Sequence, residues 1–85
     1  MTASTEYNGW KNRQTWNVAL YLANEEHLYR ALVARKEKIL KARNPYILAI
    51  RCLGLMNEHT PDNISYSGSR LAYRELNEFV RDLVA

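Results

Sequence analysis

Residues 7–17 have the sequence YNGWKNRQTWN, and this stretch contains both tryptophans of the 85-residue chain. Its first part, Asn8-Gly9, is typical of a turn because both residues tolerate a positive φ angle. Its second part is typical of a helix start, because the Asn12 side chain can accept a hydrogen bond from a backbone N–H of the first turn. The stretch therefore predicts a turn followed by a helix that begins near Asn12.

Four segments of the chain carry apolar residues at the spacing of a helix. They span residues 12–23, 25–43, 45–58 and about 67–83. The third segment begins with Pro45, which suits the first position of a helix, and it is apolar nearly all round. Ser67 or Ser69 is the predicted cap of the fourth segment. We therefore predict an all-α fold, a compact bundle of about four helices with the third helix at its centre.

The second and fourth segments have distinct apolar faces. In the second, two adjoining rows cover about 140° of the helix surface. These rows are Leu28, Leu32 and Ile39, and Tyr29, Val33 and Leu40. The fourth segment carries one stripe, formed by Ala72, Leu76, Phe79, Val80 and Leu83. Both patterns predict helices that pack one side against a shared core.

Length and composition predict one domain, because 85 residues are too few for two hydrophobic cores. We expect residues 1–10 to form a flexible tail and turn, and residues 11–85 to form the helical domain. The single cysteine, Cys52, cannot form an internal disulfide, which fits a reducing compartment. Neither a signal peptide nor an apolar run of about 18 residues is visible. These features predict a cytoplasmic protein without membrane association.

Residues 9–20, GWKNRQTWNVAL, resemble the hallmark of a family of short, functionally uncharacterised proteins from bacteriophages and mobile elements. Members carry the motif W-K-N-x-x-T-W-N-V, then an aliphatic–aromatic step and an acidic patch. Here these are LYL at 20–22 and NEE at 24–26. Many relatives have a third tryptophan where this chain has Tyr21. The resemblance is specific over the first third of the chain. It implies a phage or mobile-element origin and supplies no activity.

The motif also suggests a binding site. Aromatic and arginine side chains dominate binding hot spots, and they stack on bases or on peptide side chains. We therefore predict a partner-binding site at Trp10, Lys11, Arg13 and Tyr21. In the alternative interpretation the motif is scaffold: Trp16 lies in the core and Trp10 folds back over the first helix. The amides and hydroxyls of Asn12, Thr15 and Asn17 then satisfy backbone groups.

A basic stretch supports a second hypothesis. Residues 30–43 hold six of the twelve positive charges and one acid. On a helix, Arg30, Lys38 and Lys41 cluster on one side, where they could contact nucleic-acid phosphates or an acidic protein. A solvated helix face is the alternative. Helix-turn-helix DNA binding is a weaker candidate, because the third segment offers only Arg51 and Asn57 toward bases.

Reactive clusters are sparse. His27 and His59 are not at metal-ligand spacing with each other or with Cys52, and no phosphate-binding glycine loop is present. We therefore expect neither enzymatic activity nor a metal or other cofactor. Six tyrosines are many for so small a domain, and their amphipathic rings suit interfaces. The first hypothesis is a non-enzymatic protein that binds and modulates a host protein, as a host-takeover or anti-defence factor. The alternative is a nucleic-acid-binding accessory protein, and a homodimer is compatible with either.

Overall fold

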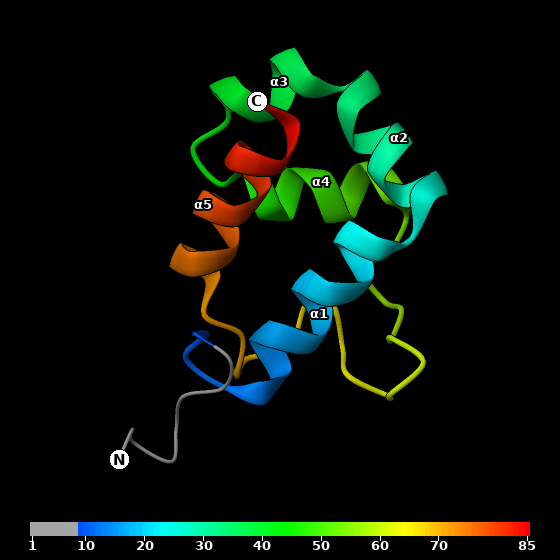
Figure 1. The fold of residues 1–85 in the computed structure, drawn as a ribbon, viewed down its shortest axis with the longest axis vertical. Coiled ribbons are helices and arrows are strands. Elements are labelled where there is room, and N and C mark those ends of the chain that lie inside the picture. Colours follow the sequence, from blue (N-terminus) through cyan, green and yellow to red (C-terminus); the bar gives the residue numbers. More distant parts are fainter. Residues whose placement is uncertain (1–8) are drawn as a thin grey trace.

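The computed structural model describes residues 9–85, and this part of the chain is all-α, as predicted (Figure 1). Its five helices are α1 (Arg13–Asn24), α2 (Glu26–Ala34), α3 (Lys36–Lys41), α4 (Pro45–Leu53) and α5 (Tyr73–Val84). Within the described range, an isolated β-bridge pairs His59 with Ser65. A flexible tail and turn was predicted for residues 1–10, and the first eight of these residues lie outside the described range.

Two of the predicted helix starts are confirmed. The Asn12 Oδ1 atom accepts the Thr15 backbone N–H at 2.8 Å, so this side chain caps α1. Pro45 is the first residue of α4, where its missing N–H leaves no hydrogen bond unmade. The same helix ends at Leu53, earlier than predicted, because Gly54 adopts a left-handed conformation with φ of 73°.

The fourth helix starts later than Ser67 or Ser69. Ser67 is fixed in a loop: its hydroxyl donates to the Met56 carbonyl at 2.6 Å and its N–H donates to the Ser65 hydroxyl at 3.2 Å. Helix α5 begins only at Tyr73, and the capping residue Ala72 has no side-chain oxygen. Tertiary hydrogen bonds of the preceding loop therefore decide where this helix begins.

The predicted second helix is broken in two. At Arg35 the backbone leaves the helical region, with φ of −111° and ψ of 22°, and its N–H bonds to the Leu32 carbonyl three residues back. Leu32 and Ile39, on either side of the break, are both fully buried. The bend allows α2 to contact α1 while α3 contacts α4 and α5. The two helices meet at an angle at the top of Figure 1.

The core lies where these helices converge. Helix α1 contacts α2 and α5, α3 contacts α5, and α4 contacts α2, α3 and α5. The largest fully buried hydrophobic side chains of the core are Tyr46, Leu22, Leu32, Ile39, Ile50 and Leu76. Helix α4 crosses the middle of the molecule, and α1, α2, α3 and α5 surround it in Figure 1.

Only one of the two apolar rows on residues 25–43 faces the core. Leu28, Leu32 and Ile39 are buried. Tyr29, Val33 and Leu40 are each 39% exposed, so the second row lies on the surface. The predicted apolar face is therefore wider than the face that packs.

Candidate functional site

The polar residues at the start of α1 fasten this helix to the segment before α5. The Asn12 Nδ2 atom donates to the Arg70 carbonyl at 2.7 Å. The Thr15 hydroxyl donates to Asn12 Oδ1 at 2.7 Å and accepts the Ala72 N–H at 2.9 Å. The bonds to Arg70 and Ala72 join residues 58 and 57 positions apart in the chain. The amide and the hydroxyl are thus occupied inside the fold.

Asn17 makes a second connection, to the turn after α4. This fully buried side chain donates from Nδ2 to the Asp62 carboxylate at 2.6 Å, and its Oδ1 accepts the Thr60 hydroxyl at 2.7 Å. Asp62 also accepts the Tyr21 hydroxyl at 3.5 Å. Partial burial, and then the Asp62 carboxylate, raise the pKa of Tyr21. Asn17 and Tyr21 therefore belong to one polar contact that holds the turn against α1.

The two tryptophans line a pocket on another side of α1. The half-buried Trp10 ring meets Phe79 of α5 edge to face, with ring centroids 5.4 Å apart and planes at 75°. The pocket has a volume of about 170 Å³. Its lining is entirely apolar or aromatic: Trp10, Trp16, Ala19, Leu20, Ala23 and Phe79. Trp16 is half-buried, so it is a pocket wall as well as a packing residue.

The four predicted partner-binding residues do not form a single platform. Trp10 lines the apolar pocket, whereas Tyr21 lies about 140° around α1 from Trp16 and contacts Asp62. Lys11 and Arg13 are exposed. The Lys11 backbone N–H donates to Glu75 Oε1 at 2.9 Å, which ties the chain beside Trp10 to α5. The structure thus pairs Trp10 with Trp16 and Phe79 and separates it from Tyr21.

A second hollow, of about 320 Å³, lies on the other side of the Trp10–Phe79 contact. It is lined by Gly9, Trp10, Glu75, Glu78, Phe79 and Asp82. Phe79 is therefore shared by both hollows, although its sequence spacing had placed it in the buried stripe of the fourth segment. The spacing of Glu75, Glu78, Phe79 and Asp82 (i, i+3, i+4, i+7) is the signal that marks them as one face.

The residues of the nucleic-acid hypothesis lie on two helices rather than one. Arg30, on α2, pairs with Glu26 at 2.7 Å, the only ion pair among residues 9–85. Lys38 and Lys41 lie on α3 and are exposed, without an acidic partner in the described part of the chain. The break at Arg35 separates them from Arg30.

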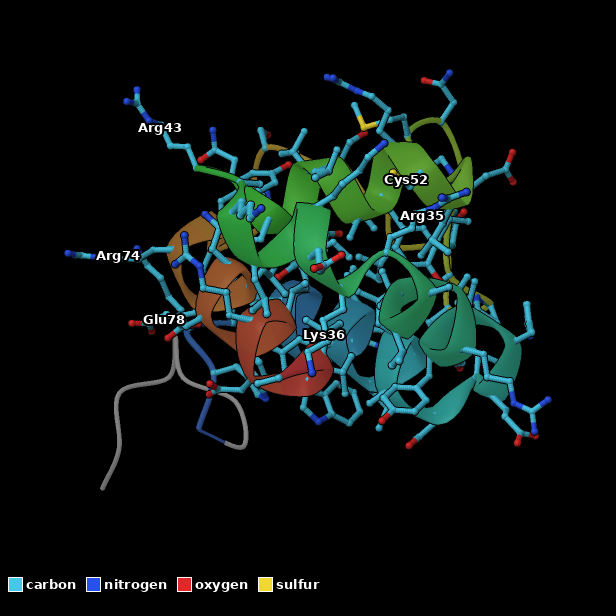
Figure 2. The ribbon with its side chains drawn as sticks, turned by 90° about the horizontal axis from the view of Figure 1, so that it is seen from above. Arg35, Lys36, Arg43, Cys52, Arg74 and Glu78 are labelled. Carbon is cyan, nitrogen blue, oxygen red and sulfur yellow. The ribbon has the colours of Figure 1, made fainter. Side chains whose placement is uncertain are left out.

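The other cations of this stretch diverge as well. In Figure 2, Arg35 and Lys36 leave the junction of α2 and α3 in different directions, and Arg43 projects from another corner of the molecule. The basic residues between positions 30 and 43 therefore do not gather on one face. Only the α3 pair of Lys38 and Lys41 remains as a local basic patch.

Several tyrosines that suggested an interface are engaged inside the fold. Tyr46 is fully buried and its hydroxyl donates to the Tyr66 carbonyl. The Tyr73 hydroxyl donates to the Gly68 carbonyl at 2.7 Å. Burial raises the pKa of Tyr46 well above its usual value of 10.0, and also raises the pKa of Tyr66 and Tyr73. Among the tyrosines of residues 9–85, Tyr29 is the exposed one.

Residues 9–85 contain no group of three or more His, Cys, Asp or Glu side chains arranged to hold a metal ion. Cys52 is half-buried and free. Within the same residues, every helix is too short or too polar to cross a bilayer.

Comparison with known proteins gives one match. No curated protein and no solved structure matches the chain. The model of a family of unknown function, DUF7249, matches residues 3–85, which is nearly the whole chain. This confirms the expectation of an uncharacterised family, and the chain belongs to DUF7249.

Proposed function

We propose that this protein is a non-enzymatic phage or mobile-element protein that binds a host protein in the host cytoplasm and modulates it. The observation that carries the proposal is the apolar pocket of Trp10, Trp16 and Phe79 on the surface between α1 and α5. Tryptophan is among the residues that most often form the energetic centre of a protein interface. The phage or mobile-element origin rests on the resemblance of residues 9–20 to proteins of that source.

The pocket has the size and chemistry for one apolar side chain. A dry cavity of about 150 Å³ lined by apolar residues accommodates benzene. The pocket here, about 170 Å³, is of similar volume and has aromatic walls on two sides. A leucine, methionine or phenylalanine of a partner would lose its hydration there, worth about 1.5–3 kcal/mol for full burial. Such an anchor in a preformed pocket is the usual centre of a protein–protein contact.

The polar residues of the motif support the proposal that the apolar pocket is the binding site. Asn12, Thr15 and Asn17 are engaged in internal hydrogen bonds, so they keep α1 in position against α5 and the Thr60–Asp62 turn. The pocket is then held by two elements that cannot shift independently. A rigid pocket loses little conformational entropy when it binds.

A second candidate function, nucleic-acid binding, rests on the exposed Lys38 and Lys41 of α3, which have no acidic partner among residues 9–85. Its affinity would fall with salt, because each phosphate contact releases counterions. Two neighbouring lysines contact few phosphates, so weak binding with a shallow salt slope is the expectation from this patch.

The test is affinity purification of the tagged full chain from bacterial lysate, with and without nuclease. The proposal predicts a stoichiometric protein that survives nuclease treatment. The variant Ala23→Gln places a longer side chain at the exposed rim of the pocket without touching the core. It should reduce recovery of that protein at least tenfold, which corresponds to a loss of about 1.4 kcal/mol in binding free energy. Ala34→Gln makes the same change on α2 and is the matched control.

The opposite results would overturn the proposal. If recovery depends on nucleic acid and is lost by charge reversal of Lys38 and Lys41, α3 is the binding element. If no protein is recovered above background, or if Ala23→Gln and Ala34→Gln behave alike, the pocket does not bind the host protein.

A further inference from the structure

We infer that the partner segment carries a basic side chain next to its apolar anchor, because an acidic hollow adjoins the apolar pocket across the Trp10–Phe79 wall. This inference rests on the proposed function and names the chemistry of the partner. The apolar pocket selects the anchor, and the second hollow, of about 320 Å³, selects a lysine or arginine beside it.

The acids of this hollow lie on one stripe of α5. Glu75, Glu78 and Asp82 have the spacing i, i+3 and i+7, so they face the same direction on the helix. Arg74 lies on the same side of α5 as Glu78, one turn earlier, whereas Arg81 donates from Nη2 to the Ala42 carbonyl at 3.3 Å. The acids of the hollow therefore have one arginine of this helix as a neighbour.

These carboxylates have little internal compensation. Glu75 accepts the Lys11 backbone N–H, which uses one of its oxygens. Within residues 9–85, no Lys, Arg or His nitrogen lies within 4.0 Å of any of the three carboxylates. Figure 2 shows Arg74 and Glu78 on the same outer side of the molecule, although they form no ion pair. A chain with a net charge of +3 thus gathers three carboxylates beside Trp10, with Lys11 and Arg74 as neighbouring cations.

The aromatic wall adds to the selection of a cation. Trp10 and Phe79 line the acidic hollow as well as the apolar pocket. An ammonium or guanidinium group over an aromatic face is attracted by the ring, and tryptophan is the best such partner. The long aliphatic stem of lysine or arginine would also cover apolar surface on the wall. An acidic or neutral side chain would gain neither contribution.

A random twelve-residue peptide library provides the test. The immobilised full chain is used for selection, and the Ala23→Gln chain removes peptides that do not use the apolar pocket. The expected peptides have a large apolar residue with lysine or arginine within four positions. Selection on the Glu78→Lys/Asp82→Lys chain should enrich aspartate or glutamate, instead of lysine or arginine, within four positions of the apolar residue. Selected sequences without a basic preference, or no enriched peptide at all, would overturn the inference.

Affinities of one selected peptide make the result quantitative. Glu78→Gln and Asp82→Asn should each weaken binding about threefold, as expected for exposed charge pairs, and should reduce its salt dependence. Glu58→Gln and Glu37→Gln, exposed and on other elements, are controls with the same charge change. If the hollow variants and the control variants have equal affinity for the peptide while Ala23→Gln still abolishes host-protein capture, the inference fails and the proposed function stands. If capture is insensitive to Ala23→Gln, the proposed function fails.

Discussion

The start of α1 and the helices α2 and α3 are both rich in polar residues, but they use these residues in opposite ways. At the start of α1, Asn12, Thr15 and Asn17 bond to residues 43 to 58 positions away in the chain. Among residues 9–85, the charged side chains of α2 and α3 form only the local Glu26–Arg30 ion pair. The first region uses polar groups to position helices, and the second presents them to solvent.

The difference shows how polar density is to be interpreted. A buried amide or hydroxyl requires a specific partner, so its neighbours in space become fixed. An exposed lysine requires none and contributes little to stability. The polar residues around tryptophan in the first region therefore stabilise the fold, and an apolar pocket lies beside them. The predictions below test this contrast, beginning with the largest effect.

Asn17→Ala should have the largest effect on stability. It leaves the Thr60 hydroxyl without its acceptor and the Asp62 carboxylate without its amide donor, and an unsatisfied buried group costs about 1–3 kcal/mol. We expect the free energy of unfolding to fall by about 2–3 kcal/mol in urea denaturation. Asn57→Ala, at an exposed position, is the control and should stay within about 0.5 kcal/mol. Equal values for the two variants would contradict the role of Asn17.

Asn12 provides a graded test of the same contact. Asn12→Ala removes both the cap of α1 and the bond to the Arg70 carbonyl, and loss of such a cap costs about 1 kcal/mol. Asn12→Asp keeps the capping oxygen and loses only the amide donor, so it should lie between Asn12→Ala and the wild-type chain. An Asp variant as unstable as the Ala variant would show that the contact to Arg70, rather than the cap, dominates.

Alkaline pH should destabilise the core through Tyr46. Because burial raises the pKa of Tyr46 above the usual 10.0, the unfolded state loses its proton first as pH rises. The contribution is complete below pH 10, and above it stability should decrease by about 1.4 kcal/mol per pH unit for this group. Urea denaturation between pH 8 and 11 measures the slope. Tyr46→Phe should cost about 1 kcal/mol at pH 8 and flatten the slope. An unchanged slope would mean that other groups cause the alkaline loss.

Charge reversal on α3 should have the smallest effect. Lys38→Glu/Lys41→Glu alters two exposed side chains without an acidic partner among residues 9–85. We expect the free energy of unfolding to change by less than about 0.5 kcal/mol. Host-protein capture should also be unchanged. A large loss of stability would show that α3 packs through its lysines, which the exposure of these side chains argues against.

Local signals in the sequence predicted the local structure well. The capping side chain of Asn12 and the initial proline of α4 act through neighbouring residues, and both were confirmed. The spacing of apolar residues also predicted an all-α fold. Such features depend on a few consecutive residues, so the sequence contains them directly.

Features that depend on distant residues could not be predicted. The break at Arg35 lets α2 contact α1 while α3 contacts α5, and no glycine or proline marks it. The partners of Asn17 are 43 and 45 positions away, and Phe79 meets Trp10 only because α1 and α5 pack together. The predicted site grouped Trp10 with Tyr21, but Trp10 lines the apolar pocket whereas Tyr21 contacts Asp62. Whether the site binds a partner stays a prediction.

Hydrogen exchange by mass spectrometry, on the free chain and on its complex with the captured host protein, tests the central claim most directly. The claim is that the surface between α1 and α5 binds the host protein, whereas helices α2 and α3 do not. The account predicts slower exchange in the complex at residues 9–23 and 75–82, which border the two hollows, and unchanged exchange at residues 26–41. Protection confined to residues 26–41 would contradict it and would place the binding surface on the exposed row of Tyr29, Val33 and Leu40.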